Sequence, residues 1–205
     1  AGLPTYDKNN PFPEETNRQL VSRLADIHLC PTQKSYDNLC SELAPGKKFI
    51  VGNTVLDNLV NLQTTYSNNI IVTLHRRENH TIMNEWFTAV NNLAIENLDY
   101  NFIIPLHPNP NVKKWSHLLT NVNVIEPVEY ENFIDLISNC RLLITDSGGI
   151  QEEASFLRKK CIVCRKVTER GESLNTFSFL AKKPADLRYV FYGHIDNFIP
   201  SQEHA

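Results

Sequence analysis

The 205-residue sequence predicts an α/β protein in which helices cover a doubly wound parallel sheet. Short runs rich in Ile, Val and Leu alternate with longer amphipathic stretches, which is the pattern of parallel strands joined by crossover helices. The length allows one to one and a half domains. Hydrophobic residues make up 41% of the chain and charged residues 21%, as in ordinary folded proteins.

Seven apolar runs are the predicted strands. They cover Ile27 to Cys30, Phe49 to Val51, Ile70 to Leu74, Phe102 to Leu106, Val122 to Ile125, Leu142 to Thr145 and Ile162 to Arg165. Helical periodicity covers Glu14 to Leu24, Gln33 to Leu43, Val55 to Gln63, Met83 to Leu98, Val112 to Leu119, Phe133 to Asn139 and Gly149 to Leu157. Residues 181–205 mix prolines with aromatic residues and predict no clean helix.

Composition excludes several classes of protein. The net charge of -3 and the pI near 6.2 give no field that would attract a polyanion, so we expect no nucleic-acid partner. No stretch approaches the ~18 uncharged apolar residues of a membrane span, so we expect no membrane association. The chain begins at Ala1 without a charged n-region and shows no signal peptide, and we expect it to be a fragment.

The cysteines indicate reduced thiols rather than disulfides. Their number, five, is odd, and Cys30, Cys40 and Cys140 lie in apolar segments, which predicts buried thiols and a cytoplasmic location. Cys161 and Cys164 have the spacing of a metal-binding pair, but they lie in a predicted strand and no second pair follows. We therefore expect these two to pack in the core and no metal to bind.

The segment after the strand that ends at Thr145 has the character of an anion-binding turn. Ser147, Gly148 and Gly149 precede a predicted helix, whose first N–H groups lack partners and can donate to a phosphate. Glu153 lies one turn into this predicted helix, where it could accept hydrogen bonds from a ribose diol above the phosphates. Alternatively, Ser147 caps the helix and the acidic residues complement its dipole. Neither a Walker A loop nor a G-x-G-x-x-G motif is present, which leaves a nucleoside diphosphate attached to another group as the favoured ligand.

Other polar residues follow neighbouring predicted strands. His75 and Arg76 follow the third strand, His107 the fourth and Arg170 the seventh, and the carboxyl ends of parallel strands meet at one edge of a sheet. His75 could donate to a phosphate oxygen and stabilise a departing diphosphate. Its alternative role is to cap a helix beside a solvated network of Arg and Glu side chains.

The Glu14–Arg18 pair and Phe133 each allow a structural and a functional interpretation. Glu14 and Arg18 are four residues apart on a predicted helix, which indicates either a surface ion pair or a catalytic carboxylate held by an arginine. Phe133 begins a helix and either packs in the core or stacks on a base.

Seven motifs together resemble the non-hydrolysing UDP-N-acetylglucosamine 2-epimerases. They are His-Arg-Arg-Glu-Asn at 75–79, His-Pro-Asn-Pro at 107–110, residues 146–154, Thr-Glu-Arg at 168–170, Pro-Phe-Pro-Glu-Glu-Thr-Asn-Arg at 11–18, Val-Gly-Asn-Thr-Val-Leu-Asp at 51–57 and Ala-Gly-Leu at 1–3. They follow the family's order and approximate spacing across residues 1 to about 176. Chance does not account for so many motifs in register.

The resemblance implies the second half of a two-domain GT-B-type fold, whose halves are both Rossmann-like. Residues 1–30 would be the end of the N-terminal domain and the domain junction, residues 31–180 the UDP-binding domain, and residues 181–205 are left unassigned. It also implies a homodimer for the full-length protein and a role in polysaccharide biosynthesis.

The resemblance implies an isomerase that needs no cofactor. UDP is eliminated anti from C1 with loss of the C2 proton, and the resulting 2-acetamidoglucal takes UDP back with the opposite C2 configuration, so UDP-GlcNAc and UDP-ManNAc interconvert. The catalytic positions would be Glu14, Arg18 and His75. The substrate would be held by Phe133, Ser147, Gly148, Gly149, Glu153 and Arg170. Arg76 and His107 match residues that touch a second, regulatory UDP-N-acetylglucosamine.

Two alternatives follow from departures from the family pattern. Pro4 stands where the family has arginine, and Gly171 where it has proline. These changes favour a non-catalytic homologue that binds UDP-sugars. A GT-B-type glycosyltransferase, which would require a separate acceptor, is the third reading.

Overall fold

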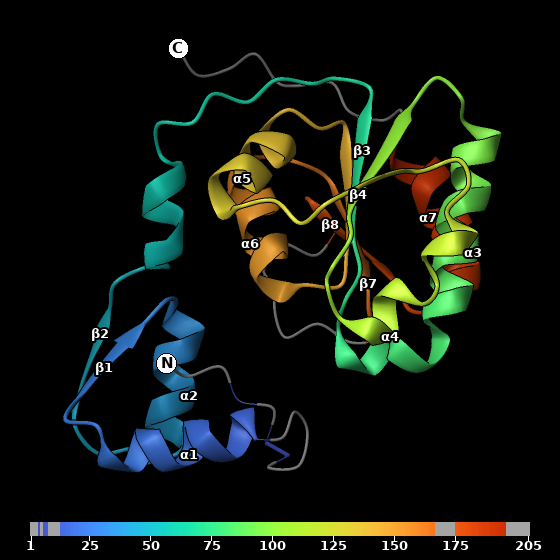
Figure 1. Cartoon of the computed structure of the whole chain (residues 1–205). Coiled ribbons are helices and arrows are strands. Elements are labelled where there is room, and N and C mark those ends of the chain that lie inside the picture. The colour runs from blue at the N-terminus through green and yellow to red at the C-terminus, as the bar shows by residue number, and fades with distance from the viewer. Residues whose placement is uncertain (1–3, 5, 8–12, 167–174, 196–205) are drawn as a thin grey trace. The chain divides into compact units, whose positions relative to one another are not determined.

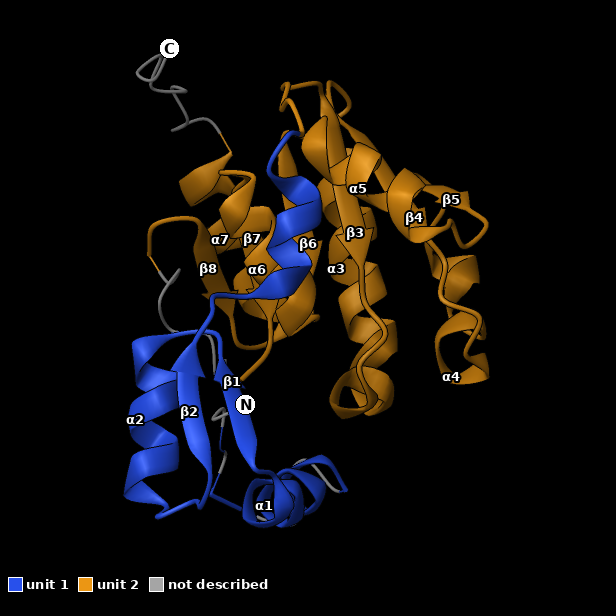
Figure 2. Ribbon diagram, turned by 90° about the vertical axis from the view of Figure 1, so that its left-hand side faces the viewer, with its two compact units in different colours: residues 1–61 blue, residues 62–205 orange. Residues whose placement is uncertain are grey.

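A computed structural model of the chain describes residues 4, 6, 7, 13–166 and 175–195. The chain divides into two compact units, residues 1–61 and 62–205, which Figure 2 colours separately. We call them unit 1 and unit 2. The domain boundary expected between residues 30 and 31 falls inside unit 1, where Cys30 packs with Leu39 and strand β1 (Ile27–Cys30) pairs with β2 (Lys47–Ile50).

Unit 1 is a small α/β layer. Its elements are α1 (Glu14–Leu24), β1 (Ile27–Cys30), α2 (Gln33–Ser41), β2 (Lys47–Ile50) and the 3-10 helix η1 (Thr54–Leu59). The two strands pair in parallel. Thr32 begins α2 because its hydroxyl accepts a hydrogen bond from the Ser35 N–H. Gly46 precedes β2 with φ +82°, where a Cβ would lie 2.6 Å from the Ala25 carbonyl oxygen, so only glycine fits this turn.

Unit 2 is built on a six-stranded parallel sheet with the order β5-β4-β3-β6-β7-β8. The strands are β3 (Asn69–Thr73), β4 (Asn101–Pro105), β5 (Asn123–Ile125), β6 (Leu142–Thr145), β7 (Cys161–Cys164) and β8 (Ser178–Ala181). The α-helices are α3 (Met83–Glu96), α4 (Pro110–Lys113), α5 (Tyr130–Ser138), α6 (Gly148–Phe156) and α7 (Pro184–His194). Figure 1 shows α5 and α6 on one face of this sheet and α3 and α7 on the other.

The core of unit 2 explains why its strands read as continuous apolar runs. Residues of β6 and β7 are buried at every position, as expected for parallel strands covered on both faces. The largest core side chains, Trp86, Phe87, Phe102 and Phe191, pack where α3 and α7 cover the sheet. Cys161 and Cys164 are fully buried free thiols, which confirms core packing, whereas Cys40 is exposed and the prediction that it is buried was wrong.

The predicted fold class is confirmed, and all seven predicted strands are present with small shifts of their ends. Three local predictions were wrong. The helix expected over 55–63 is the 3-10 helix η1, and the one over 112–119 is split into α4 and the 3-10 helix η3 (Ser116–Leu118). Residues expected to hold no clean helix contain α7, which begins at Pro184 because proline suits the first helical position. Strand β8 was also missed.

Candidate functional site

The strand order reverses between β3 and β6, where the topology predicts a crevice. From β3 the chain proceeds to β4 and β5 on one side, and from β6 it proceeds to β7 and β8 on the other. Ligands of open α/β sheets bind beyond the carboxyl ends of the strands at this reversal of order. The loop that carries His75 and Arg76 follows β3, and the turn that carries Ser147 follows β6. The topology therefore brings these two predicted segments together.

The start of α6 has donors available for an anion. Ser147 is the N-cap residue, but its hydroxyl makes no capping hydrogen bond, so the alternative role as a side-chain cap was wrong. Its own N–H donates to the Thr145 hydroxyl at 3.0 Å. No acceptor is recorded among the described residues for the N–H groups of Gly148 and Gly149, which belong to the first turn. Gly149 is exposed, and no Cβ narrows the approach to it.

Asp146 holds the two sides of the crevice together. Its carboxylate is fully buried and accepts the N–H of His75 at 3.1 Å and that of Arg76 at 2.9 Å. The side-chain amide of Asn79 donates to the same carboxylate at 2.9 Å and also to the Cys164 carbonyl. The Trp86 indole N–H in turn donates to Asn79. The loop after β3 is thereby fixed against the ends of β6 and β7.

The two predicted histidines lie together at this edge. The rings of His75 and His107 stack with centroids 4.9 Å apart. The Thr73 hydroxyl lies 3.4 Å from His75 Nδ1. Burial, followed by the neighbouring His75, lowers the pKa of His107 below its ordinary value. The lowered pKa favours the neutral form of the His107 imidazole, which can both donate and accept hydrogen bonds.

The Arg and Glu network expected around His75 exists, but its arginine comes from another strand. Arg165 follows β7, is nearly buried, and donates from Nε to Glu78 at 2.8 Å. The sequence did not point to this pair, because the two residues are far apart along the chain. Arg165 therefore places a further cation at the carboxyl edge of the sheet.

Helices α5 and α6 carry a second group of predicted residues. Glu153 lies on α6 with 6% of its surface exposed, and the Tyr130 hydroxyl of α5 donates to its Oε1 at 2.9 Å. Burial raises the pKa of Glu153, and the hydrogen bond from Tyr130 opposes that shift. Burial and the nearby carboxylate raise the pKa of Tyr130 to about 12. Phe133 is half-buried one turn further along α5. Sequence analysis missed Tyr130.

In unit 1 the carboxylate held by Arg18 is not that of Glu14. Arg18 donates to both oxygens of Glu15 and to both oxygens of Glu42, with distances of 2.7 to 2.9 Å. Glu15 is buried, whereas Glu14 is exposed. The expected pairing of Glu14 with Arg18 was therefore wrong, because Arg18 turns toward the residue three positions before it and toward the end of α2. Glu14 stays available on the surface of unit 1.

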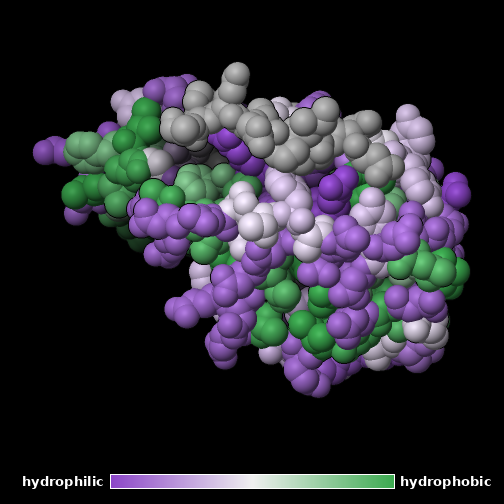
Figure 3. All heavy atoms as spheres, turned by 90° about the horizontal axis from the view of Figure 1, so that it is seen from above, coloured by the Kyte–Doolittle hydropathy of each residue, from purple (hydrophilic) through white to green (hydrophobic). Residues whose placement is uncertain are grey.

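Other features do not contribute to this edge. The predicted Arg170 lies outside the described residues. Within the described part of the chain no cluster of His, Cys, Asp and Glu has the arrangement of a metal site. Among the same residues, no helix has the length and apolar character that crossing a bilayer requires. On the face shown in Figure 3, hydrophobic side chains lie in separate groups among hydrophilic ones.

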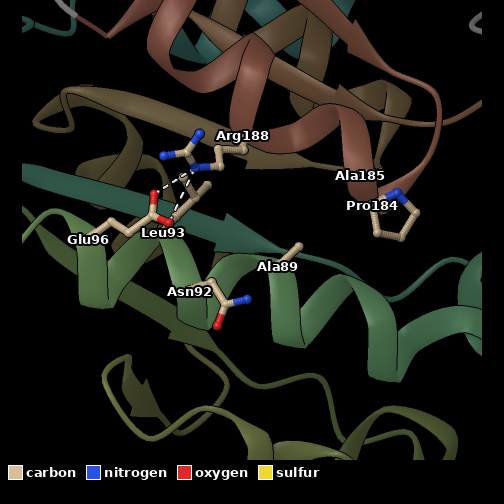
Figure 4. Close-up of a pocket in the computed structure, with 7 residues that line it drawn as sticks. All are labelled: Ala89, Asn92, Leu93, Glu96, Pro184, Ala185 and Arg188. Atoms are coloured by element: carbon tan, nitrogen blue, oxygen red, sulfur yellow. Dashed lines mark hydrogen bonds and ion pairs between the residues drawn. The ribbon is translucent and has the colours of Figure 1, made fainter.

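A separate cavity lies between α3 and α7. Figure 4 shows it beside the Glu96–Arg188 ion pair. Its volume of about 210 Å³ is below the ~300 to 1,000 Å³ of typical ligand pockets. The predicted polar residues lie instead beyond the ends of β3 and β6, which we take as the candidate site.

A parallel sheet whose order reverses beside a glycine-rich helix start is typical of α/β proteins with a Rossmann-like domain. The family model described as UDP-N-acetylglucosamine 2-epimerase matches residues 1–184. This chain belongs to that family. The resemblance found in the motifs is thereby confirmed.

Related sequences and structures agree. The UDP-N-acetylglucosamine 2-epimerase of Campylobacter jejuni is 41% identical over 209 residues, covering 85% of this chain and 53% of the relative. That of Neisseria meningitidis serogroup A is 42% identical over 205 residues, covering 85% and 54%. This chain thus spans about half the length of the curated relatives it matches.

Solved structures give the same fold. A crystal structure of the UDP-GlcNAc 2-epimerase from Neisseria meningitidis bound to UDP-GlcNAc matches with a TM-score of 0.83 and 37% identity, over 94% of this chain and 59% of that one. A co-structure of S. aureus MnaA with UDP has a TM-score of 0.81, 33% identity, and coverage of 96% and 58%. The heptosyltransferase WaaC of E. coli, at 12% identity and a TM-score of 0.51 over 78% of this chain, shows the GT-B-type fold alone.

Proposed function

We propose that this chain supplies the UDP-binding half of a UDP-N-acetylglucosamine 2-epimerase. The observation that carries the proposal is the reversal of strand order between β3 and β6, where the carboxylate of Asp146 joins the segment that begins α6 to the His75 loop. The relatives' names and the UDP-GlcNAc and UDP complexes of two structural neighbours support the choice of ligand.

The diphosphate lies at the start of α6 in this proposal. The amides of Gly148 and Gly149 and the Ser147 hydroxyl donate to its oxygens, because these groups have no partner in the described residues and lie at the positive end of the helix dipole. Glu153 accepts from the ribose hydroxyls and Phe133 stacks on uracil. Arg170 is proposed as a further substrate contact from its motif alone.

The reaction breaks two bonds of the sugar nucleotide and reforms them. A base removes the C2 proton while the C1–O bond breaks, so the electron pair of the C2–H bond forms the C1–C2 double bond of 2-acetamidoglucal and UDP departs. His75 donates to the leaving diphosphate and stabilises its charge. Re-addition of UDP with protonation on the other face of C2 gives UDP-ManNAc. Glu14 and Arg18 are proposed as the contributions of unit 1, with Arg18 anchored by Glu15 and Glu42.

Finer parts of the proposal rest on the family resemblance. Arg76 and His107 take part in regulation by a second UDP-N-acetylglucosamine, and the stacking of His107 on His75 provides a physical connection to the first site. The complete protein acts as a homodimer in the cytoplasm, in polysaccharide biosynthesis, and residues 1–30 belong to its domain junction.

Solvent exchange tests the activity. The natural protein containing this chain is incubated with UDP-N-acetylglucosamine in heavy water, and deuterium is expected at C2. His75→Ala should lower the exchange rate by at least 100-fold, whereas His117→Ala, a change away from the crevice, should not. Absence of C2 exchange by the wild-type protein would rule out the epimerase.

The second candidate is a UDP-sugar-binding homologue without turnover. It is favoured by Pro4, which stands where the family resemblance implies an arginine. For the isolated 205-residue chain we expect weak UDP binding and no catalysis, because a crevice open on one side does not exclude water. Ser147→Ala and Glu153→Ala should each weaken that binding. Epimerisation by the isolated chain would contradict this expectation.

A further inference from the structure

The Glu153 carboxylate has hydrogen-bond acceptor sites that are available to a ligand. An ionised carboxylate offers about four acceptor sites. Among the described residues, the Tyr130 hydroxyl is the one recorded hydrogen-bond partner of this carboxylate, and it occupies Oε1. Glu153 is 6% exposed, and no hydrogen bond to its Oε2 is recorded among these residues. Hydroxyl groups of a ligand would complete its hydrogen bonding.

Tyr130 fixes the orientation of the Glu153 carboxylate. The 2.9 Å hydrogen bond to Oε1 limits rotation of the carboxylate and leaves Oε2 for a ligand. A hydrogen bond to the charged form also favours ionisation, which burial disfavours. An ionised acceptor forms stronger hydrogen bonds with hydroxyl donors than a neutral carboxylic acid does.

Tyr130 also belongs to the helix that carries the proposed base contact. Tyr130 and Phe133 are three residues apart on α5, so they share a face of that helix. Helix α6 carries both Glu153 and the glycine-rich start. The hydrogen bond between Tyr130 and Glu153 therefore joins the helix proposed to contact uracil to the helix proposed to hold the diphosphate.

We propose that Tyr130 is a positioning residue that makes the site select a ribonucleotide over a deoxyribonucleotide. It acts through Glu153, which it orients toward the ribose hydroxyls, and it does not itself contact the reacting atoms. This inference rests on the proposed function, since it takes UDP as the ligand of the crevice.

The test compares UDP with 2′,3′-dideoxy-UDP by isothermal titration of this chain. Wild type should bind UDP at least 10-fold more tightly than the dideoxy analogue, as hydrogen bonds to a charged group predict. Tyr130→Phe removes only the hydroxyl. It should weaken UDP binding about 5- to 10-fold and leave binding of the analogue nearly unchanged, so that the preference largely disappears.

Two further variants sharpen the result. Glu153→Gln should abolish the same preference, and combining it with Tyr130→Phe should add little, because both act through one carboxylate. Tyr189→Phe removes the hydroxyl of an exposed tyrosine on α7 and should leave both affinities unchanged.

The outcomes separate this inference from the proposed function. An undiminished preference for UDP in Tyr130→Phe, or equal losses for both nucleotides, would overturn the role of Tyr130 while UDP binding stands. A wild-type chain that does not bind UDP would overturn the proposed function and this inference with it.

Discussion

Units 1 and 2 differ in how completely they bury their own sheets. In unit 2 the central strands β3, β6 and β7 are buried on both faces. In unit 1 the side chains of Ile27, Leu29 and Phe49 are about half exposed. The register pairs Leu29 with Phe49, so these side chains share one face of the β1–β2 sheet. Parallel sheets are normally covered on both faces.

The two units therefore carry different parts of the proposed site. Unit 2 contains the proposed nucleotide site, where the buried Asp146 carboxylate fixes the loop after β3. Unit 1 presents the proposed catalytic residues Glu14 and Arg18 on a layer whose core is small. We therefore expect perturbations to have separate effects on the two units, and the variants below test that separation.

The largest effect is expected from Asp146→Ala. It leaves the N–H groups of His75 and Arg76 and the Asn79 amide without their acceptor inside a buried crevice. The free energy of unfolding of unit 2 should fall by about 3 to 5 kcal/mol. Both tryptophans lie in unit 2, so urea unfolding followed by fluorescence reports on this unit. Asp135→Ala on the exposed side of α5 is the control. A loss below ~1 kcal/mol for Asp146→Ala would show that the hydrogen bonds to Asp146 do not stabilise unit 2.

A smaller and local effect is expected from Arg18→Met. The change leaves the buried Glu15 carboxylate without its cationic partner, at a cost of about 2 to 3 kcal/mol within unit 1. Hydrogen exchange should accelerate in α1 and α2, while the fluorescence midpoint of unit 2 stays constant. Arg23→Met is the control, because Arg23 donates only one recorded bond, to the Leu43 carbonyl. Equal acceleration in both units would contradict their independence.

Lys159 predicts a pH dependence of the stability of unit 2. Burial lowers its pKa from 10.5 to about 8. Above pH 8 the unfolded chain therefore holds a proton that the folded chain has lost, and stability rises with pH. Between pH 8 and pH 9 the unfolding free energy of wild type should gain about 1 kcal/mol relative to Lys159→Met. A constant difference would show that Lys159 is not desolvated.

The smallest effect is expected for the ion pair between Arg188 and Glu96. Both side chains lie at the surface, where solvent screens their interaction. The hydrogen bonds that Arg188 and the Tyr192 hydroxyl donate to Glu96 nevertheless lower the pKa of this carboxyl group. Arg188→Met should leave the thermal midpoint and the UDP affinity nearly unchanged. A clear loss of UDP affinity would move the site toward the α3–α7 cavity of Figure 4.

The sequence predicted the strands well because buried parallel strands are short apolar runs that differ sharply from their surroundings. It predicted that His75, His107 and Ser147 lie at one edge, since that follows from strand direction alone. It could not identify Asp146, Arg165 or Tyr130 as contacts of this edge, because their partners are distant in sequence. The choice between Glu14 and Glu15 depends on the rotamer of Arg18 and on Glu42, which periodicity does not encode.

The central claim is that the diphosphate of UDP binds to the N–H groups that begin α6. Backbone amide NMR of the 205-residue chain during titration with UDP tests it most directly. The largest saturable shifts should occur at Ser147, Gly148 and Gly149, with smaller ones at His75 and Arg76. Saturable binding that leaves the amides of residues 147–149 unmoved would contradict the claim.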